Sequence, residues 1–323
     1  MNVIRRLLAD PRLRARLARA LTGAGIYRGV DRLLARLAGG LVLAFHNLPA
    51  PRFVAQVHAL APARPVSLDE LLARHGRGES TAGLFAITFD DGVGETVRTV
   101  AAAARAEGWP VTFFIPTGYV ENPDGMPFQW LRAVRPHLRA EVFTLSSRTL
   151  DLRAPGAIAA FVRATTRLMH TARREAYEPL VRELAEHLIT TGRVARERLA
   201  PPLSISWEEM ASLAREPLLR FESHGVSHTA VSALDAATLA DELRASALAI
   251  RERTGVPCNH FCYPYGSRLS IGVTAPAVVA CHYASAVTME RGRLARHDRY
   301  RLPRIPLYPG DEGAVARLKV LTT

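Results

Sequence analysis

The stretch 84–92 constrains the fold more strongly than any other part of this chain of 323 residues. It reads Leu-Phe-Ala-Ile-Thr-Phe-Asp-Asp-Gly, a mainly apolar run that ends on two adjacent carboxylates and a glycine. A short apolar run bounded by a turn signal predicts a buried strand of a parallel sheet. Folds of the α/β class place their chemistry at the carboxyl ends of such strands. By itself, however, the pair Asp90 and Asp91 is more simply a solvated turn that closes the strand.

Strands and helices alternate along most of the chain. Buried strands are predicted at 41–45, 84–89, 111–115, 218–222, 259–263, 283–287 and 302–307, and helices at 53–60, 67–74, 95–107, 207–214 and 236–254. Short connections on each side of the helix at 95–107 indicate a parallel crossover unit. The alternation predicts an α/β fold. A single barrel fits its length better than an open sheet, although periodicity alone does not separate the two.

Two segments stand apart from this pattern. Residues 1–38 predict one or two basic amphipathic helices, which could contact an anionic membrane surface or, as is commoner, pack against the domain behind them. Residues 39–323 predict a single domain. Within it, a richly charged helical stretch indicates an insertion at about 130–203, because the strand–helix pattern resumes afterwards.

The net charge of +12 is spread along the chain rather than concentrated in one tract. Arginines occur from Arg5 to Arg304 without one interleaved aromatic tract, which argues against a nucleic-acid partner but leaves an anionic substrate or membrane surface open. Three cysteines, Cys258, Cys262 and Cys281, cannot form a disulfide framework and are interpreted as core residues. Because no secretory signal or membrane-spanning run is apparent, we expect a cytoplasmic protein, with residues 1–38 as an optional contact to the membrane surface.

A second chemical signal is the segment that runs from His224 to His228. Two histidines at i and i+4 face the same way if the segment is helical, and they can then bind one ion. Together with a strand-end carboxylate they offer a site of two histidines and one carboxylate for Zn²⁺ or a similar divalent ion. A second carboxylate beside the ligand can serve as a general base.

Five segments, taken in chain order, resemble the motifs of the polysaccharide deacetylases, the carbohydrate esterase family 4 with its chitooligosaccharide deacetylase homology domain. They are Thr88-Phe89-Asp90-Asp91-Gly92, Pro110-Val111-Thr112-Phe113-Phe114, His224-Gly225-Val226-Ser227-His228, Phe261-Cys262-Tyr263-Pro264-Tyr265-Gly266 and Arg301-Leu302-Pro303-Arg304-Ile305. The resemblance covers roughly residues 41–307. It implies a distorted (β/α) barrel that removes N- or O-acyl groups from sugars with the help of a metal ion.

The resemblance also implies roles for particular residues. Asp91, His224 and His228 are expected to bind the divalent ion, with Zn²⁺ as the first choice, and Asp90 is expected to be the catalytic base. The division is chemically sound, because metal ligation keeps a carboxylate ionised while its neighbour takes a proton from water. The backbone amide of Tyr265 is expected to donate to the oxyanion that forms on the acyl group.

Two departures from the family pattern change these expectations. Cys262 stands where many members carry an arginine that orients the base, so Arg304 becomes the candidate partner of Asp90, with a structural surface arginine as the alternative. The usual late histidine that acts as the acid is also absent, because 302–310 contains no histidine. The segment 42–46 resembles the N-terminal strand of the biofilm-polysaccharide deacetylase branch, which implies that His46 supplies the acid unless it is structural.

Aromatic side chains complete the expected site. Tyr119, Trp130 and Tyr263, with Phe128, are candidate sugar-stacking residues, although aromatic residues more commonly lie in the core. We therefore expect a metal-dependent hydrolase that removes an N-acetyl group from an amino sugar of a polysaccharide, an oligosaccharide or a lipid-linked glycan precursor. The alternatives are a carbohydrate-binding scaffold that has lost turnover and a deacylase of a non-sugar amide.

Overall fold

A computed structural model describes residues 40–323 except 295–297 and 312, so the helices predicted for residues 1–38 lie outside the described residues. Its main sheet has eight strands in the order β10-β1-β3-β4-β7-β8-β9, with β2 also paired to β3. Their bounds are β1 Leu41–Phe45, β2 Arg64–Val66, β3 Leu84–Phe89, β4 Val111–Ile115, β7 Leu219–Ser223, β8 His260–Cys262, β9 Ser285–Val287 and β10 Ile305–Pro306. Every pairing between these strands is parallel, as the short crossovers predicted.

The two ends of the sheet approach each other through one short segment. Leu302 forms a parallel bridge to Val287 of β9, and Ile305 of β10 pairs with Leu43 of β1. The sheet therefore curls into a half barrel, which confirms the predicted barrel class over an open sheet. The strand expected at 302–307 is shorter than predicted. Leu302 pairs with β9 whereas Ile305 pairs with β1, so these residues do not form one continuous strand.

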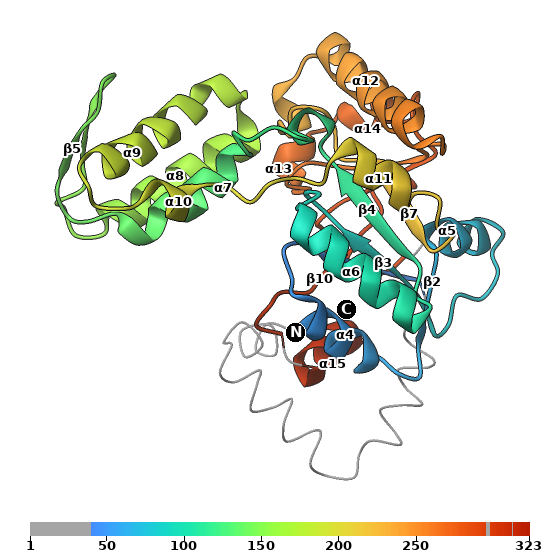
Figure 1. Cartoon of the computed structure of the whole chain (residues 1–323). Coiled ribbons are helices and arrows are strands. Elements are labelled where there is room, and N and C mark those ends of the chain that lie inside the picture. Colours follow the sequence, from blue (N-terminus) through green and yellow to red (C-terminus); the bar gives the residue numbers. More distant parts are fainter. Residues whose placement is uncertain (1–39, 295–297, 312) are drawn as a thin grey trace.

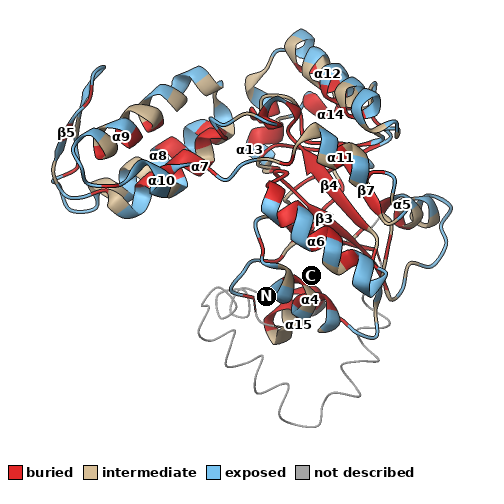
Figure 2. Cartoon of the chain, viewed as in Figure 1, coloured by how far each residue is buried: buried red, intermediate tan, exposed pale blue. Residues whose placement is uncertain are grey.

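The central strands are buried on both faces. All residues of β1, β3 and β4 are buried, which explains why their sequences read as nearly continuous apolar runs. Leu43, Phe45 and Phe89 pack outward into the largest core, beneath the helices, whereas Val42 packs into the barrel interior. Figure 2 shows these strands as buried at the centre of the molecule. Fully burying a large apolar side chain contributes about 1.5–3 kcal/mol, so these strands fix the frame that carries the site.

Helices cover the outer face of the curled sheet (Figure 1). They are α4 Ala50–His58, α5 Leu68–Gly76, α6 Gly94–Glu107, α11 Trp207–Leu213, α12 Ala236–Thr254, α13 Arg268–Ile271, α14 Ala275–Val279 and α15 Gly313–Leu321. Serine caps begin two of these helices: the Ser67 hydroxyl accepts from the backbone N–H of Glu70 at 3.1 Å, and Ser206 forms a capping box with Glu209. None of the described helices is long and apolar enough to cross a bilayer.

The segment between β4 and β7 forms an insertion with a core of its own. It contains α7 Pro127–Val134, β5 Val142–Thr144, β6 Thr149–Asp151, α8 Ala157–Thr171, α9 Glu178–Thr190 and α10 Arg196–Leu199. Buried side chains such as Phe143, Val181 and Leu184 pack together there, and Figure 1 shows the insertion as a lobe beside the sheet. The antiparallel hairpin of β5 and β6 was not predicted, because three-residue strands are too short for a recognisable alternation. The helix α7 begins at Pro127, whose fixed φ suits the first turn of a helix.

A candidate catalytic and metal-binding centre

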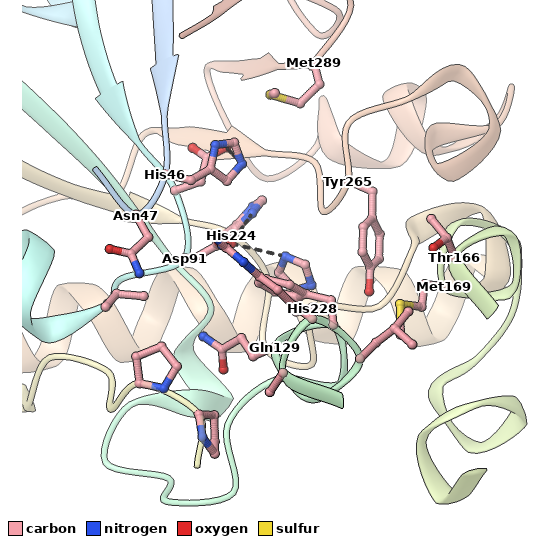
Figure 3. Close-up of a pocket in the computed structure, with 18 of the residues that line it drawn as sticks. His46, Asn47, Asp91, Gln129, Thr166, Met169, His224, His228, Tyr265 and Met289 are labelled. Carbon is pink, nitrogen blue, oxygen red and sulfur yellow. Dashed lines mark ion pairs between the residues drawn. The ribbon is translucent and has the colours of Figure 1, made fainter. Parts of the chain in front are cut away.

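Polar side chains gather at the carboxyl edge of the sheet. His46 follows β1, Asp90 and Asp91 follow β3, and His224 follows β7. Because the strands are parallel, their carboxyl ends meet at one edge, and side chains that are far apart in sequence become neighbours there. Figure 3 shows His46, Asp91, His224 and His228 directed into one cavity. The carboxylates are therefore part of a cluster, which excludes the simple solvated turn.

Asp91 and two histidines form a group that could hold a metal ion. Oδ1 of Asp91 lies 3.8 Å from Nε2 of His224 and 3.6 Å from Nε2 of His228, and all three side chains are buried. The ligand atoms lie within 4.8 Å of one another. Two imidazoles and one carboxylate are a donor set that suits Zn²⁺ and leaves coordination positions open.

The protonation states also fit a metal. Nδ1 of His224 donates to the backbone carbonyl of Cys262 at 2.7 Å, so the lone pair of this imidazole is on Nε2, which faces Asp91. Burial and the neighbouring His228 lower the pKa of His224 to about 4, so its ring is neutral at neutral pH, as a ligand must be. Burial alone would raise the pKa of Asp91, but its contact with His228 outweighs that effect and keeps the carboxyl ionised.

The two histidines converge through a loop rather than along a helix. Residues 224–230 have no helical structure, so the conditional expectation of a helical i, i+4 pair was wrong. The carboxylate of Glu242 on α12 accepts from the backbone N–H groups of Val226 at 2.9 Å and Ser227 at 3.0 Å. The loop consequently places the two imidazole centroids 4.8 Å apart. Glu242 was missed, because no local sequence signal connects a helix residue to a loop on another element.

Asp90 is held by a buried arginine. Both Nη atoms of Arg304 donate to the Asp90 carboxylate, at 2.8 and 2.7 Å, and its Nε donates to the carbonyl of Thr288 at 2.9 Å. Arg304 has no exposed surface, which excludes the alternative of a surface arginine. Burial alone would raise the pKa of Asp90, but Arg304 outweighs it and holds that pKa well below its usual range.

Cys262 occupies the space beside this ion pair. Its Sγ lies 3.0 Å from Nη2 of Arg304 and 3.5 Å from Oδ2 of Asp90, so Arg304 reaches the site from β10 and a small thiol leaves room for it. Asp90, His224 and Cys262 also come close enough to be considered as metal ligands. They fit a cation poorly, because Arg304 already engages the carboxylate and burial raises the pKa of the thiol well above its usual range. Among the other cysteines, Cys258 is half-buried and Cys281 is exposed, so the core interpretation was wrong for Cys281.

His46 also approaches the Asp90 carboxylate. Its Nε2 is 3.6 Å from Oδ2 of Asp90, and 37% of its side chain is exposed, unlike the buried histidines of the metal group. This exposure lets the imidazole contact both the Asp90 carboxylate and a molecule in the cleft. Its position is therefore suitable for proton transfer, as expected for an acid.

A cleft of about 940 Å³ lies over the centre, and the insertion forms one of its walls. Phe128 from α7 contributes a ring whose centroid is 5.3 Å from that of His228. Tyr265 stands between barrel and insertion, with its ring 4.9 Å from that of His228 and 4.7 Å from that of His170 on α8. Figure 3 shows Thr166 and Met169 of α8 on the far side of Tyr265 from Asp91.

Only part of the aromatic set expected to bind substrate lines this cleft. Tyr263 lies on its wall, with its hydroxyl donating to the carbonyl of Tyr300 at 2.9 Å. Trp130 packs in the core of the insertion, and Tyr119 is buried with its hydroxyl donating to the carbonyl of Ser227. Neither Trp130 nor Tyr119 lines the cleft, because the helix α7 turns Phe128 rather than Trp130 towards it.

Backbone strain is concentrated in the centre. Among the described residues, four that are not glycine have positive φ, and three of them are Asp91 at 72°, His228 at 53° and Tyr265 at 61°. Such conformations cost on the order of 1–3 kcal/mol each and persist only where the surroundings fix them. The strain therefore indicates a site whose geometry is imposed by the fold.

Comparisons with known proteins agree with this architecture. A family model described as polysaccharide deacetylase matches residues 77–275. The chain is similar in structure to Streptococcus pyogenes deacetylase PplD in complex with acetate, with a TM-score of 0.56, 12% identity, and coverage of 87% of this chain and 98% of that one. It is also similar to IcaB from Ammonifex degensii, with a TM-score of 0.55, 16% identity, and coverage of 87% and 97%. A third similar structure is the BpsB deacetylase domain from Bordetella bronchiseptica, with a TM-score of 0.53, 14% identity, and coverage of 83% of this chain and 95% of that one. No curated protein matches the chain.

Proposed function

Because the chain belongs to the polysaccharide deacetylase family, we propose that it removes the N-acetyl group from an amino sugar by metal-assisted hydrolysis. The observation that carries the proposal is the joint placement of two neighbouring carboxylates. One faces the Nε2 atoms of two buried imidazoles, and the other is fixed by a buried guanidinium. A scaffold that only bound sugar would need neither arrangement, so the geometry favours an active enzyme.

Asp91, His224 and His228 are the residues that would hold the ion. When bound, a divalent ion such as Zn²⁺ supplies Lewis acidity towards the acyl carbonyl and towards water. The three side chains come from two strand ends and a constrained loop, so the protein fixes them before any ion arrives. This prior placement suits a site that keeps open positions for reactants.

Asp90 and His46 would carry the protons. Asp90 takes a proton from the attacking water, whose oxygen adds to the acyl carbon, and Arg304 fixes the direction in which this carboxylate acts. The C–N bond then breaks, and His46 gives a proton to the leaving nitrogen, so the products are acetate and a free amine. The backbone amide of Tyr265 would donate to the oxyanion between these two events.

Acetate release tests the proposal directly. The full chain, loaded with Zn²⁺, should release acetate from N-acetylglucosamine oligomers, and Asp90→Asn should reduce the rate by a factor on the order of 10² or more. Full activity in that variant would remove Asp90 from the mechanism. If the zinc-loaded protein binds the oligomers without releasing acetate, the scaffold alternative replaces the enzyme.

A further inference from the structure

A second cavity continues the catalytic cleft across the insertion. It measures about 900 Å³ and shares four lining residues with the cleft, namely Arg135, Val162, Thr166 and His170. Its remaining wall comes mainly from 152–159 and from α8. We call this second cavity the arginine groove. A substrate that lies in the cleft therefore has a path along α8, away from the metal group.

The arginine groove has strongly positive walls. Arg135, Arg163 and Arg167 line it, and among the described residues no carboxylate does. These three side chains are exposed and make no ion pair or side-chain hydrogen bond with the described residues, whereas Arg153 at the rim is paired with Asp151. Elsewhere in the insertion most arginines are matched with carboxylates, including Arg173, Arg174, Arg182, Arg193 and Arg196. Three guanidinium groups without an ionic partner among the described residues therefore lie around this cavity.

The spacing on α8 directs this charge towards the catalytic centre. Arg163, Arg167 and His170 stand at i, i+4 and i+7, which places them on one face of the helix. With a rise of 1.5 Å per residue, the row is about 10 Å long. Its last member, His170, stacks against Tyr265, which in turn contacts His228. A sugar at the metal group would therefore extend into the row of arginines within one or two residues of its chain.

We propose that the arginine groove binds a phosphate or pyrophosphate group attached to the saccharide, so that the substrate is a phosphate-linked amino sugar. This inference rests on the proposed deacetylation. Guanidinium forks match phosphate oxygens in pairs, and three unpaired forks suit a group that carries two or more negative charges better than a single carboxylate.

Two variants separate the groove from the chemistry. Arg163→Ala combined with Arg167→Ala removes two forks, while Arg198→Ala removes a similarly exposed arginine of the insertion that lines neither cavity. The substrates are an N-acetylglucosamine oligomer, the same oligomer with an anomeric diphosphate, and one with an anomeric carboxylate. For wild type, we expect a KM about tenfold lower for the diphosphate than for the neutral oligomer, a difference that added salt reduces.

The double variant should raise the KM for the diphosphate to that of the neutral oligomer and so abolish this preference, while Arg198→Ala should keep the preference of wild type. Arg163→Lys combined with Arg167→Lys should retain part of the preference, because the charge remains and the fork is lost. Equal KM values for the charged and neutral oligomers, a stronger preference for the carboxylate, or a double variant that keeps the preference would overturn the inference.

A binding measurement distinguishes failure of this inference from failure of the proposed function. Inorganic phosphate should bind the zinc-loaded full chain in calorimetry, and the double variant should weaken that binding about tenfold. If acetate is not released but this difference persists, the deacetylation is wrong and the anion site stands. If acetate is released but phosphate binding is unchanged in the double variant, the groove inference alone is wrong.

The phosphate could belong to a soluble sugar or to a lipid headgroup. The same diphosphate oligomer is therefore supplied free in solution or attached to a lipid in phosphatidylcholine vesicles. Equal rates that both depend on Arg163 and Arg167 would support a site that recognises the phosphate alone. A higher rate on vesicles with the same dependence would support a lipid-linked source, and rates independent of both arginines would contradict the site.

Discussion

The barrel and its insertion use arginine in opposite ways. Arg304 in the barrel has no exposed surface and donates to both oxygens of Asp90, whereas Arg163 and Arg167 on α8 are exposed and have no ionic partner within the described residues. Burying a guanidinium is tolerated only when it is fully paired, so Arg304 is an internal positioning element. An exposed guanidinium can exchange water for a ligand at small cost. The comparison teaches that charge in the barrel fixes geometry, while charge in the insertion is available to a substrate.

The comparison fails most clearly if the cluster around Asp91 in the barrel is not needed for metal binding and turnover. Asp91→Ala should remove the carboxylate that both His224 and His228 face, and we expect turnover to fall by a factor on the order of 10³ or more. Metal content, measured by mass spectrometry, should fall from about one Zn²⁺ per chain to near zero. Asp241→Ala, at an exposed site on α12, is the control and should change neither quantity. Full zinc content in Asp91→Ala would show that other residues hold the ion.

Replacing each kind of arginine by methionine sharpens the comparison. Arg304→Met leaves the Asp90 carboxylate buried and unpaired, which should lower the free energy of unfolding by about 3–5 kcal/mol. Arg163→Met touches no described partner and should change it by about 0.5 kcal/mol or less. Urea denaturation at neutral pH measures the free energy of unfolding of both variants.

A double variant isolates the cause of this loss. Arg304→Met combined with Asp90→Asn removes the uncompensated charge, so it should be more stable than Arg304→Met alone. Equal stability of the two would mean that lost packing, rather than the unpaired carboxylate, explains the effect. If Arg304→Met and Arg163→Met change the free energy of unfolding equally, the buried and the exposed arginine do not differ in their contribution to stability.

Glu242 tests whether the barrel also positions the two proposed metal ligands, His224 and His228, indirectly. Glu242→Ala leaves the N–H groups of Val226 and Ser227 without their acceptor, so the loop between the two histidines should loosen. We expect zinc affinity to fall about 10-fold to 100-fold, measured by competition with a chelator. Glu252→Ala, at an exposed position of the same helix, should leave the affinity unchanged. Unchanged affinity in both variants would make Glu242 merely structural.

The smallest effect is expected at the amino end of the sheet, where His260 pairs with Asp69 at 2.9 Å. Burial alone would lower the pKa of His260, but Asp69 and Glu222 raise it above its usual range, and His260 lowers the pKa of Asp69. The stabilisation due to the raised histidine is present below its unfolded pKa and is lost as the pH rises through its folded pKa. Asp69→Asn should therefore lower the Tm most at about pH 6 and less at about pH 9. If the loss of Tm in Asp69→Asn does not become smaller as the pH rises, the stabilisation does not come from the ion pair between His260 and Asp69.

Local sequence patterns predicted most of the regular structure. The apolar run that forms β3, the caps at Ser67 and Ser206, and the helix α12 all depend on neighbouring residues, so a reading of the chain finds them. The hairpin of β5 and β6 depends on pairing between very short strands, which leaves no periodic signal. Trp130 shows the same limit, because the path of α7 decides whether its ring faces the core or the cleft.

The sequence by itself determined that Asp90 and Asp91 end a buried strand. It also determined that His224 and His228 follow a later strand of the same α/β pattern. These facts follow from short-range chemistry, namely apolar burial and turn residues. Only the tertiary structure decided which groups meet there. The parallel sheet brings Asp91 to His224 and His228, the junction at β10 delivers Arg304 to Asp90, and the fold of the insertion places unpaired arginines beside the cleft. The physical reason is that electrostatic and hydrogen-bond contacts act through space, so their partners are fixed by the path of the whole chain.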